Sequence, residues 1–113
     1  MTIDFNHLQQ YTAGDRHLEA EVLGLFVETA RSALSTLKST CSGEEWRMVA
    51  HKLKGSALAV GAWDLAEISR RAELAGPTAP GVQDLLRELA SHIADTTAVI
   101  AATCADSEGA AKR

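Results

Sequence analysis

One histidine near the middle of the chain has the surroundings that a phosphoryl acceptor needs. If residues 46–61 form a helix, which turns by about 100° per residue, His51 lies opposite the apolar stripe and faces solvent. An unprotonated imidazole nitrogen is a competent nucleophile near neutral pH. Lys54, one turn further along the same face, places a positive charge beside incoming phosphate oxygens. The two residues indicate phosphoryl-transfer chemistry on the outer face of a helix.

The residues around His51 indicate that a large partner approaches this face. Gly55 lies inside the same helix, where glycine costs roughly 1 kcal/mol relative to alanine. Clearance for a protein that docks on His51 is a sufficient reason for that cost. The neighbouring side chains predict a contact surface that is apolar in part and basic in part: Arg47, Met48, Leu58, and Leu23 or Val27 from the preceding helix.

A third requirement is a group that holds the other nitrogen of the imidazole ring. In a helical hairpin that turns at 61–62, residues of the two arms meet at the same height when their numbers sum to about 124. The partner of His51 is then Glu73. A carboxylate that accepts a hydrogen bond from Nδ1–H fixes the tautomer and leaves Nε2 free to attack.

The same register places Arg70 level with Lys54. Together with Arg47 these cations make the His51 face basic, although the chain has a net charge of −4. A basic face would suit an acidic pocket on a partner. Alternatively, Arg70 forms a surface ion pair with Glu67 or Glu73, which contributes little to stability.

Helical periodicity and capping residues predict the elements that position these side chains. Four longer helices are expected at 15–40, 42–61, 62–75 and 80–105, after a short helix at 4–12. The caps are Asp4, Asp15, a Ser42–Glu45 capping box, Gly61 at a helix end, and Pro80 in a first turn. The inner face of 15–40 is assigned to Leu18, Val22, Leu25, Phe26, Thr29, Ala33 and Leu37, with Leu23, Val27 and Leu34 beside it.

These elements predict an all-α fold in a single domain that spans residues 1–113. No strand alternation is present, and short connections make consecutive helices antiparallel neighbours. We expect an up-down antiparallel four-helix bundle at 15–105, with a short additional N-terminal helix within 1–14. Residues 106–113 are small and polar and are expected to form a flexible tail.

Several classes of function are excluded by what the sequence lacks. The negative net charge argues against a nucleic-acid surface, and no apolar run is long enough to span a membrane. The N-terminus lacks a signal pattern, so a cytoplasmic location is expected. No nucleotide-binding segment is present, which argues against an enzyme that uses ATP.

Metal and disulfide sites are not expected either. The other histidines, His7, His17 and His92, lie on different predicted helices without partners at metal-ligand spacing. Cys41 and Cys104 are expected at opposite ends of the bundle, as free thiols. We therefore predict no metal and no resident cofactor.

The segment HKLKGSALAVGA at 51–62 resembles the HxLKGSxxxxGA signature of histidine phosphotransfer (HPt) domains, and LAEISRRAE at 65–73 looks like the helix that follows it in that family. The resemblance implies reversible phosphorylation of His51, with Lys54 near the phosphoryl group and Gly55 giving a receiver domain room. Glu73 matches a position where some members have a glutamate or glutamine bonded to the histidine.

The resemblance also implies the partners. These are response-regulator receiver domains, which bring Mg²⁺, and a sensor histidine kinase. The chain would then be a phosphoryl carrier without a kinase domain of its own. Dimerisation domains of histidine kinases fit less well, because they usually have an acidic residue and a proline where this chain has Lys52 and Ser56. Chemotaxis kinases begin with a similar bundle but continue for several more domains, so a free-standing protein or an excised domain is expected.

Two alternatives from other classes remain. The first is a non-catalytic helical module that binds receivers or kinases without carrying phosphate. The intact combination of His51, Lys54 and Gly55 argues against it, because a degenerate module would not need all three. The second is a ligand-binding bundle, for which the predicted helices provide no inward polar cluster.

Overall fold

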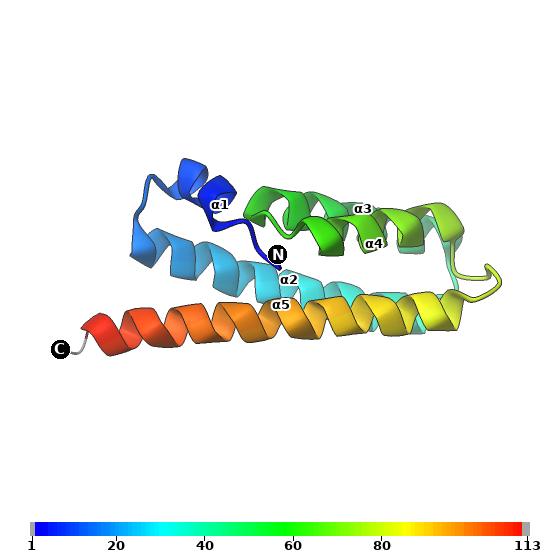
Figure 1. Ribbon diagram of the computed structural model, residues 1–113. Helices are drawn as coiled ribbons and strands as arrows, with labels where there is room; N and C mark the ends of the chain where they lie inside the picture. Colours follow the sequence, from blue (N-terminus) through cyan, green and yellow to red (C-terminus); the bar gives the residue numbers. More distant parts are fainter. Residues whose placement is uncertain (1, 112–113) are drawn as a thin grey trace.

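Five α-helices make up the fold in the computed structural model, which describes residues 2–111 and the side chains of residues 2–103. Figure 1 shows their order along the chain, and no strand occurs in the described range. The helices are α1 (Phe5–Thr12), α2 (Arg16–Ser39), α3 (Gly43–Val60), α4 (Trp63–Ala75) and α5 (Val82–Ala111). The all-helical class predicted from the sequence is confirmed.

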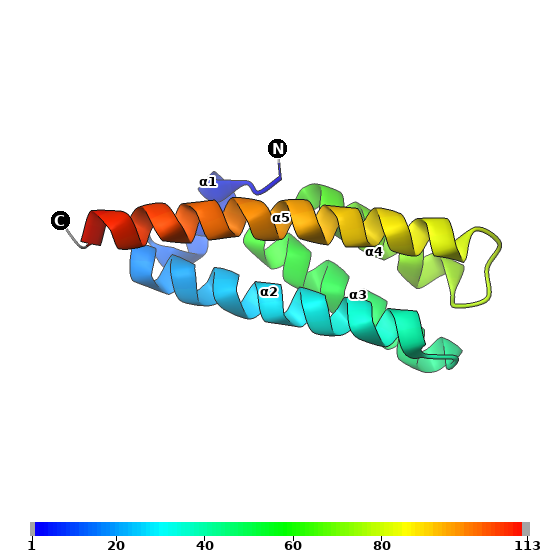
Figure 2. The ribbon, with the colours of Figure 1, turned by 90° about the horizontal axis from the view of Figure 1, so that it is seen from below.

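The four longer helices lie side by side, and consecutive ones run in opposite directions (Figures 1 and 2). Helix α3 packs against α2 and α4, and α5 packs against the other side of the same two helices. The short helix α1 contacts α2 and α3. The α3–α4 hairpin is shorter than α2 and α5, so α1 lies beyond its turn (Figure 1).

Side-chain caps begin the first three helices at the predicted residues. Asp4 accepts a hydrogen bond from the N–H of His7, and Asp15 accepts from two N–H groups in the first turn of α2. The Ser42 hydroxyl accepts from the N–H of Glu45, as in a capping box. In a full capping box the Glu45 side chain would also accept from the N–H of Ser42. Here that N–H donates instead to the hydroxyl of Thr40 at 3.1 Å.

The core lies between the four long helices. The residues of α2 that it buries differ in part from the inner face predicted from the sequence. Leu23 is 1% exposed, whereas Leu25 is 64% exposed and Leu18 is also exposed. The buried positions follow steps of three and four residues that satisfy α3 and α5 together, and Leu18 and Leu25 lie outside this stripe. The buried residues of α2 are Leu23, Phe26, Ala30, Ala33 and Leu37.

The last helix differs from the prediction at both ends. It begins at Val82, and Pro80 lies in the preceding turn, where Gly81 has a φ of 77°. It continues to Ala111 instead of ending near residue 105, since no proline interrupts this stretch. Cys41 is an exposed free thiol, and the prediction for the thiol of Cys104 lies outside the described side chains.

The N-terminal segment is fastened to the α3–α4 turn by several contacts of Asp4. Its N–H donates to the carbonyl oxygen of Gly61 at 2.8 Å, and its carboxylate accepts from Trp63 Nε1 at 3.2 Å. Ile3 and Leu8 bury their side chains in the same core. The N–H of His7, followed by Trp63, lowers the pKa of the Asp4 carboxyl below its usual value, so the contact is made by the ionised form.

Candidate functional site

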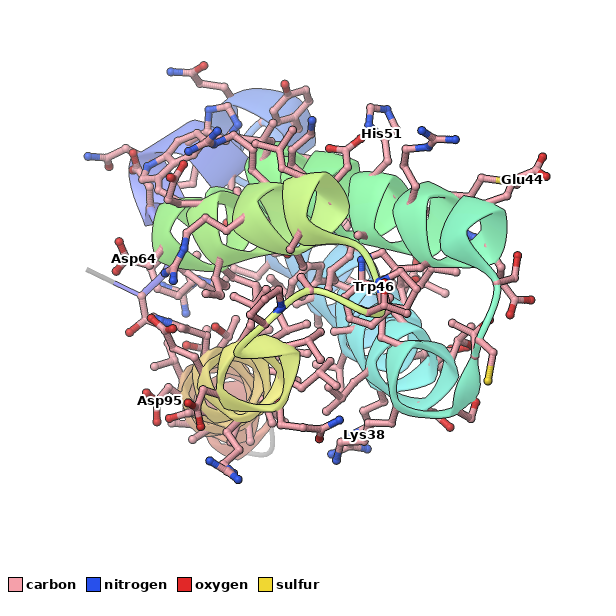
Figure 3. All side chains as sticks on the ribbon, turned by 90° about the vertical axis from the view of Figure 1, so that its right-hand side faces the viewer. Lys38, Glu44, Trp46, His51, Asp64 and Asp95 are labelled. Atoms are coloured by element: carbon pink, nitrogen blue, oxygen red, sulfur yellow. The ribbon has the colours of Figure 1, made fainter. Side chains whose placement is uncertain are left out.

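His51 lies on the outer face of α3, as predicted. Its side chain is 67% exposed. Figure 3 shows the ring on the opposite side of the helix from Trp46, which points between the helices. The side chains that hold α3 in place are buried at intervals of three and four residues: Trp46, Ala50, Leu53, Ala57 and Val60. This burial forces residue 51 outward.

Glu73 of α4 holds the ring from one side. His51 Nδ1 and Glu73 Oε2 are 2.8 Å apart, which is the pair that the hairpin register predicts. The turn that sets the register has Gly61 in the left-handed region at φ 79°. At the far end of the hairpin, Trp46 Nε1 donates to the carbonyl oxygen of Ala72 at 2.7 Å. Contacts at both ends of the hairpin therefore fix the register of α3 and α4, and this register keeps Glu73 opposite His51.

Lys54 shares the same carboxylate. Its Nζ lies 2.9 Å from Glu73 Oε1, so each carboxylate oxygen has one partner. The Lys54 side chain is 26% exposed and that of Glu73 is 17% exposed. The bond from Lys54 lowers the pKa of Glu73 most, the bond from His51 lowers it further, and burial opposes both. The carboxylate is therefore ionised at neutral pH and accepts from both neighbours.

Arg70 has a different partner from the residues of this network. It forms two hydrogen bonds with Glu67, at 2.6 and 3.0 Å, and both side chains are exposed. Of the two interpretations open for Arg70, the structure therefore contains the surface ion pair. Such a pair contributes about 1 kcal/mol or less to stability.

The predicted contact surface is present in part. Arg47, Met48 and Leu58 are exposed on α3. Leu23 cannot belong to the surface, because its side chain lies in the core, and Val27 is only half-buried. Leu25, which the sequence assigns to the inner face of its helix, is instead exposed on α2.

Gly55 has no internal reason to be glycine. A Cβ added there meets no atom within 4 Å outside its own helix backbone, and the residue lies inside a regular helix. Gly61 is the opposite case, because a Cβ there would lie 2.8 Å from the carbonyl oxygen of Asp4. The missing side chain at 55 therefore leaves room at the surface, one turn beyond His51.

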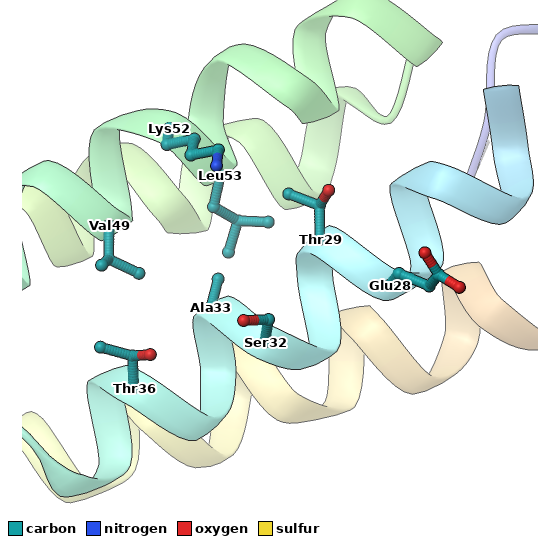
Figure 4. Close-up of a pocket in the computed structure, with 8 residues that line it drawn as sticks. All are labelled: Glu28, Thr29, Ser32, Ala33, Thr36, Val49, Lys52 and Leu53. Carbon is teal, nitrogen blue, oxygen red and sulfur yellow. The ribbon is translucent and has the colours of Figure 1, made fainter.

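The site is a surface and not a pocket. A groove of about 290 Å³ between α2 and α3 has an apolar floor and hydroxyl groups on one wall (Figure 4). Its lining includes Lys52 but none of the predicted site residues. Among the described residues, no three His, Cys, Asp or Glu side chains are arranged to hold a metal ion. None of the described helices has an apolar stretch of the length that a membrane span needs.

A comparison with models of protein families gives a match. The family model of the Hpt domain matches residues 21–103, which include all of α3 and α4 and most of α2. Searches of curated proteins and of solved structures found no match. The match covers more than half of the chain and contains His51, Lys54 and Glu73. The chain therefore belongs to the histidine phosphotransfer (HPt) domain family, whose members are phosphoryl carriers that work with histidine kinases and receiver domains in two-component signalling.

Proposed function

We propose that this protein relays a phosphoryl group, as phosphohistidine at His51 Nε2, between a histidine kinase or its receiver domain and the receiver of a response regulator. The observation that carries the proposal is an exposed imidazole whose Nδ1 is held by Glu73. Nε2 has no hydrogen-bond partner among the described residues. The nucleophilic nitrogen is thus oriented and accessible at once.

In the proposed step, the lone pair of Nε2 attacks the phosphorus of an aspartyl phosphate. The N–P bond forms, and the P–O bond breaks with its electron pair left on the aspartate. Attack by a neutral imidazole places positive charge on the ring, and the Glu73 carboxylate facing Nδ1–H stabilises that charge. The receiver supplies Mg²⁺, and we expect no cofactor on this chain.

The remaining parts of the proposal concern the scaffold and its contacts. The helices would form the up-down four-helix bundle predicted from the sequence, with α1 packed at one end. Met48 and Leu58 would provide apolar contacts to the receiver, and the exposed cation Arg47 would face its acidic pocket. A cytoplasmic location stays a prediction.

Incubation of the protein with a panel of ³²P-labelled receiver domains tests the proposal. We expect label to move to this chain as an adduct that is labile in acid and stable in alkali, and peptide mapping should place it on residues 48–52. Binding of receivers without any transfer of label would contradict the relay and favour the non-catalytic module.

Gly55→Ala separates the demands of folding from those of docking. We expect the free energy of unfolding to rise by about 0.5–1 kcal/mol, because alanine is the better helix residue and the space is open. Transfer from a receiver should nevertheless slow by about tenfold, because a methyl group would hold the partner away from Nε2. Chemical denaturation and single-turnover transfer measure the two effects.

Gly24→Ala is the matched control, since Gly24 is also a helical glycine with nothing within 4 Å of an added Cβ. It should gain similar stability and keep the wild-type transfer rate. Unchanged transfer in Gly55→Ala would remove the clearance argument for Gly55.

A further inference from the structure

Some of the cations around His51 already bind a carboxylate of this chain, and others do not. Lys54 is bonded to Glu73 and largely covered, and Arg70 is bonded to Glu67. Arg47 is exposed and forms no hydrogen bond or ion pair with any side chain that the structure describes. A phosphoryl group that arrives on Nε2 therefore meets one cation on the His51 side of α3 that has no competing partner.

Arg47 also has the right position on the helix. It precedes His51 by four residues, so the two Cβ atoms are about 5–6 Å apart on one face. Helical side chains lean toward the N-terminus, which carries the His51 ring over the turn that contains Arg47. Lys52, the other cation beside His51, lines the groove between α2 and α3 instead (Figure 4).

The charge balance favours leaving Lys54 where it is. A phosphoryl group carries about −1.5 to −2 charge at neutral pH. If Lys54 left Glu73 for the phosphate, a largely covered carboxylate would lose its closest cation and face a new anion. Arg47 can bind the phosphate without that loss, and its planar guanidinium matches two phosphate oxygens.

We propose that Arg47 is the residue that binds the phosphoryl group on His51, while Lys54 stays bonded to Glu73 as a positioning residue. This inference rests on the proposed function. It departs from the role that the family resemblance implies for Lys54, and it divides the two cations between two tasks. Arg47 contacts the transferred group, and Lys54 keeps the carboxylate ionised and in place for Nδ1.

The test uses the full chain phosphorylated with phosphoramidate and followed by ³¹P NMR, with the His51→Gln spectrum assigning the signal. We expect Arg47→Gln to raise the pKa of the phosphoryl group by about 0.5, at least twice the change in Lys54→Gln, with Arg47→Lys in between. The reverse order is expected for the ¹⁵N chemical shift of Nδ1 in the unphosphorylated protein, which reports its hydrogen bond to Glu73, and there Lys54→Gln should have the larger effect. Arg31→Gln, an exposed arginine of α2, controls for the loss of one charge.

The possible results distinguish a failure of the role of Arg47 from a failure of the phosphoryl relay. A phosphoryl pKa that responds to Lys54→Gln as much as to Arg47→Gln, or to neither, overturns the role of Arg47 and leaves the relay intact. If neither phosphoramidate nor any receiver gives a signal that depends on His51, the proposed function fails and this inference fails with it.

Discussion

The His51→Gln variant should accept no label from any receiver or kinase that labels the wild-type protein. Glutamine has the size to occupy the site but no nucleophilic ring nitrogen, so the loss should reach the detection limit. The fold should not change, because the ring is exposed and has one hydrogen-bond partner, Glu73. We expect the free energy of unfolding to fall by less than about 1 kcal/mol. Single-turnover transfer and urea denaturation measure the two quantities.

His17→Gln is the matched control for this experiment. His17 is also an exposed histidine beside a glutamate, with 3.2 Å between its Nε2 and Glu21 Oε1. Because it lies in the first turns of α2 and has no cation held by the same carboxylate in the described structure, it should keep the full transfer rate. Wild-type labelling of His51→Gln, or equal losses in both variants, would end the assignment of His51 as the acceptor.

The placement of His51 and Glu73 followed from local rules alone. Helix period fixes which face a residue occupies, and a short hairpin with a glycine at its turn fixes which residues of the two arms meet. The face that a residue occupies and the pairing across the hairpin both depend on a few residues that are close in sequence. The pair at 2.8 Å is therefore as predictable as the caps at Asp4, Asp15 and Ser42.

Other features depend on residues far apart in the chain and could not be predicted. The face of α2 is set by α3 and α5 together, which is why Leu23 rather than Leu25 is buried. The engagement of Lys54 with Glu73 was missed for a related reason. Sequence spacing indicated that both lie near His51, but the choice between carboxylate and incoming phosphate as the partner of Lys54 needs atomic positions.

Gly61 is the residue whose replacement should cost the fold most for the smallest change in side chain. Its φ of 79° is unfavourable for alanine by about 1–2 kcal/mol. An added Cβ would also lie 2.8 Å from the carbonyl oxygen of Asp4, and both groups are backbone or attached directly to it. To relieve this clash the N-terminal segment would have to move, at a further cost of about 1–3 kcal/mol. We expect Gly61→Ala to lose about 2–5 kcal/mol in chemical denaturation.

Gly14→Ala isolates the steric part of that loss. Gly14 has a φ of 80°, so it shares the backbone penalty, but a Cβ there meets nothing within 4 Å. The difference between the variants is the cost of displacing Asp4, and with it the hydrogen bonds to Gly61 and Trp63. Equal losses would show that the N-terminal segment yields freely. A larger loss in Gly61→Ala would mean that the N-terminal segment at Asp4, although it precedes the residues matched by the family, supports the turn that sets Glu73 against His51.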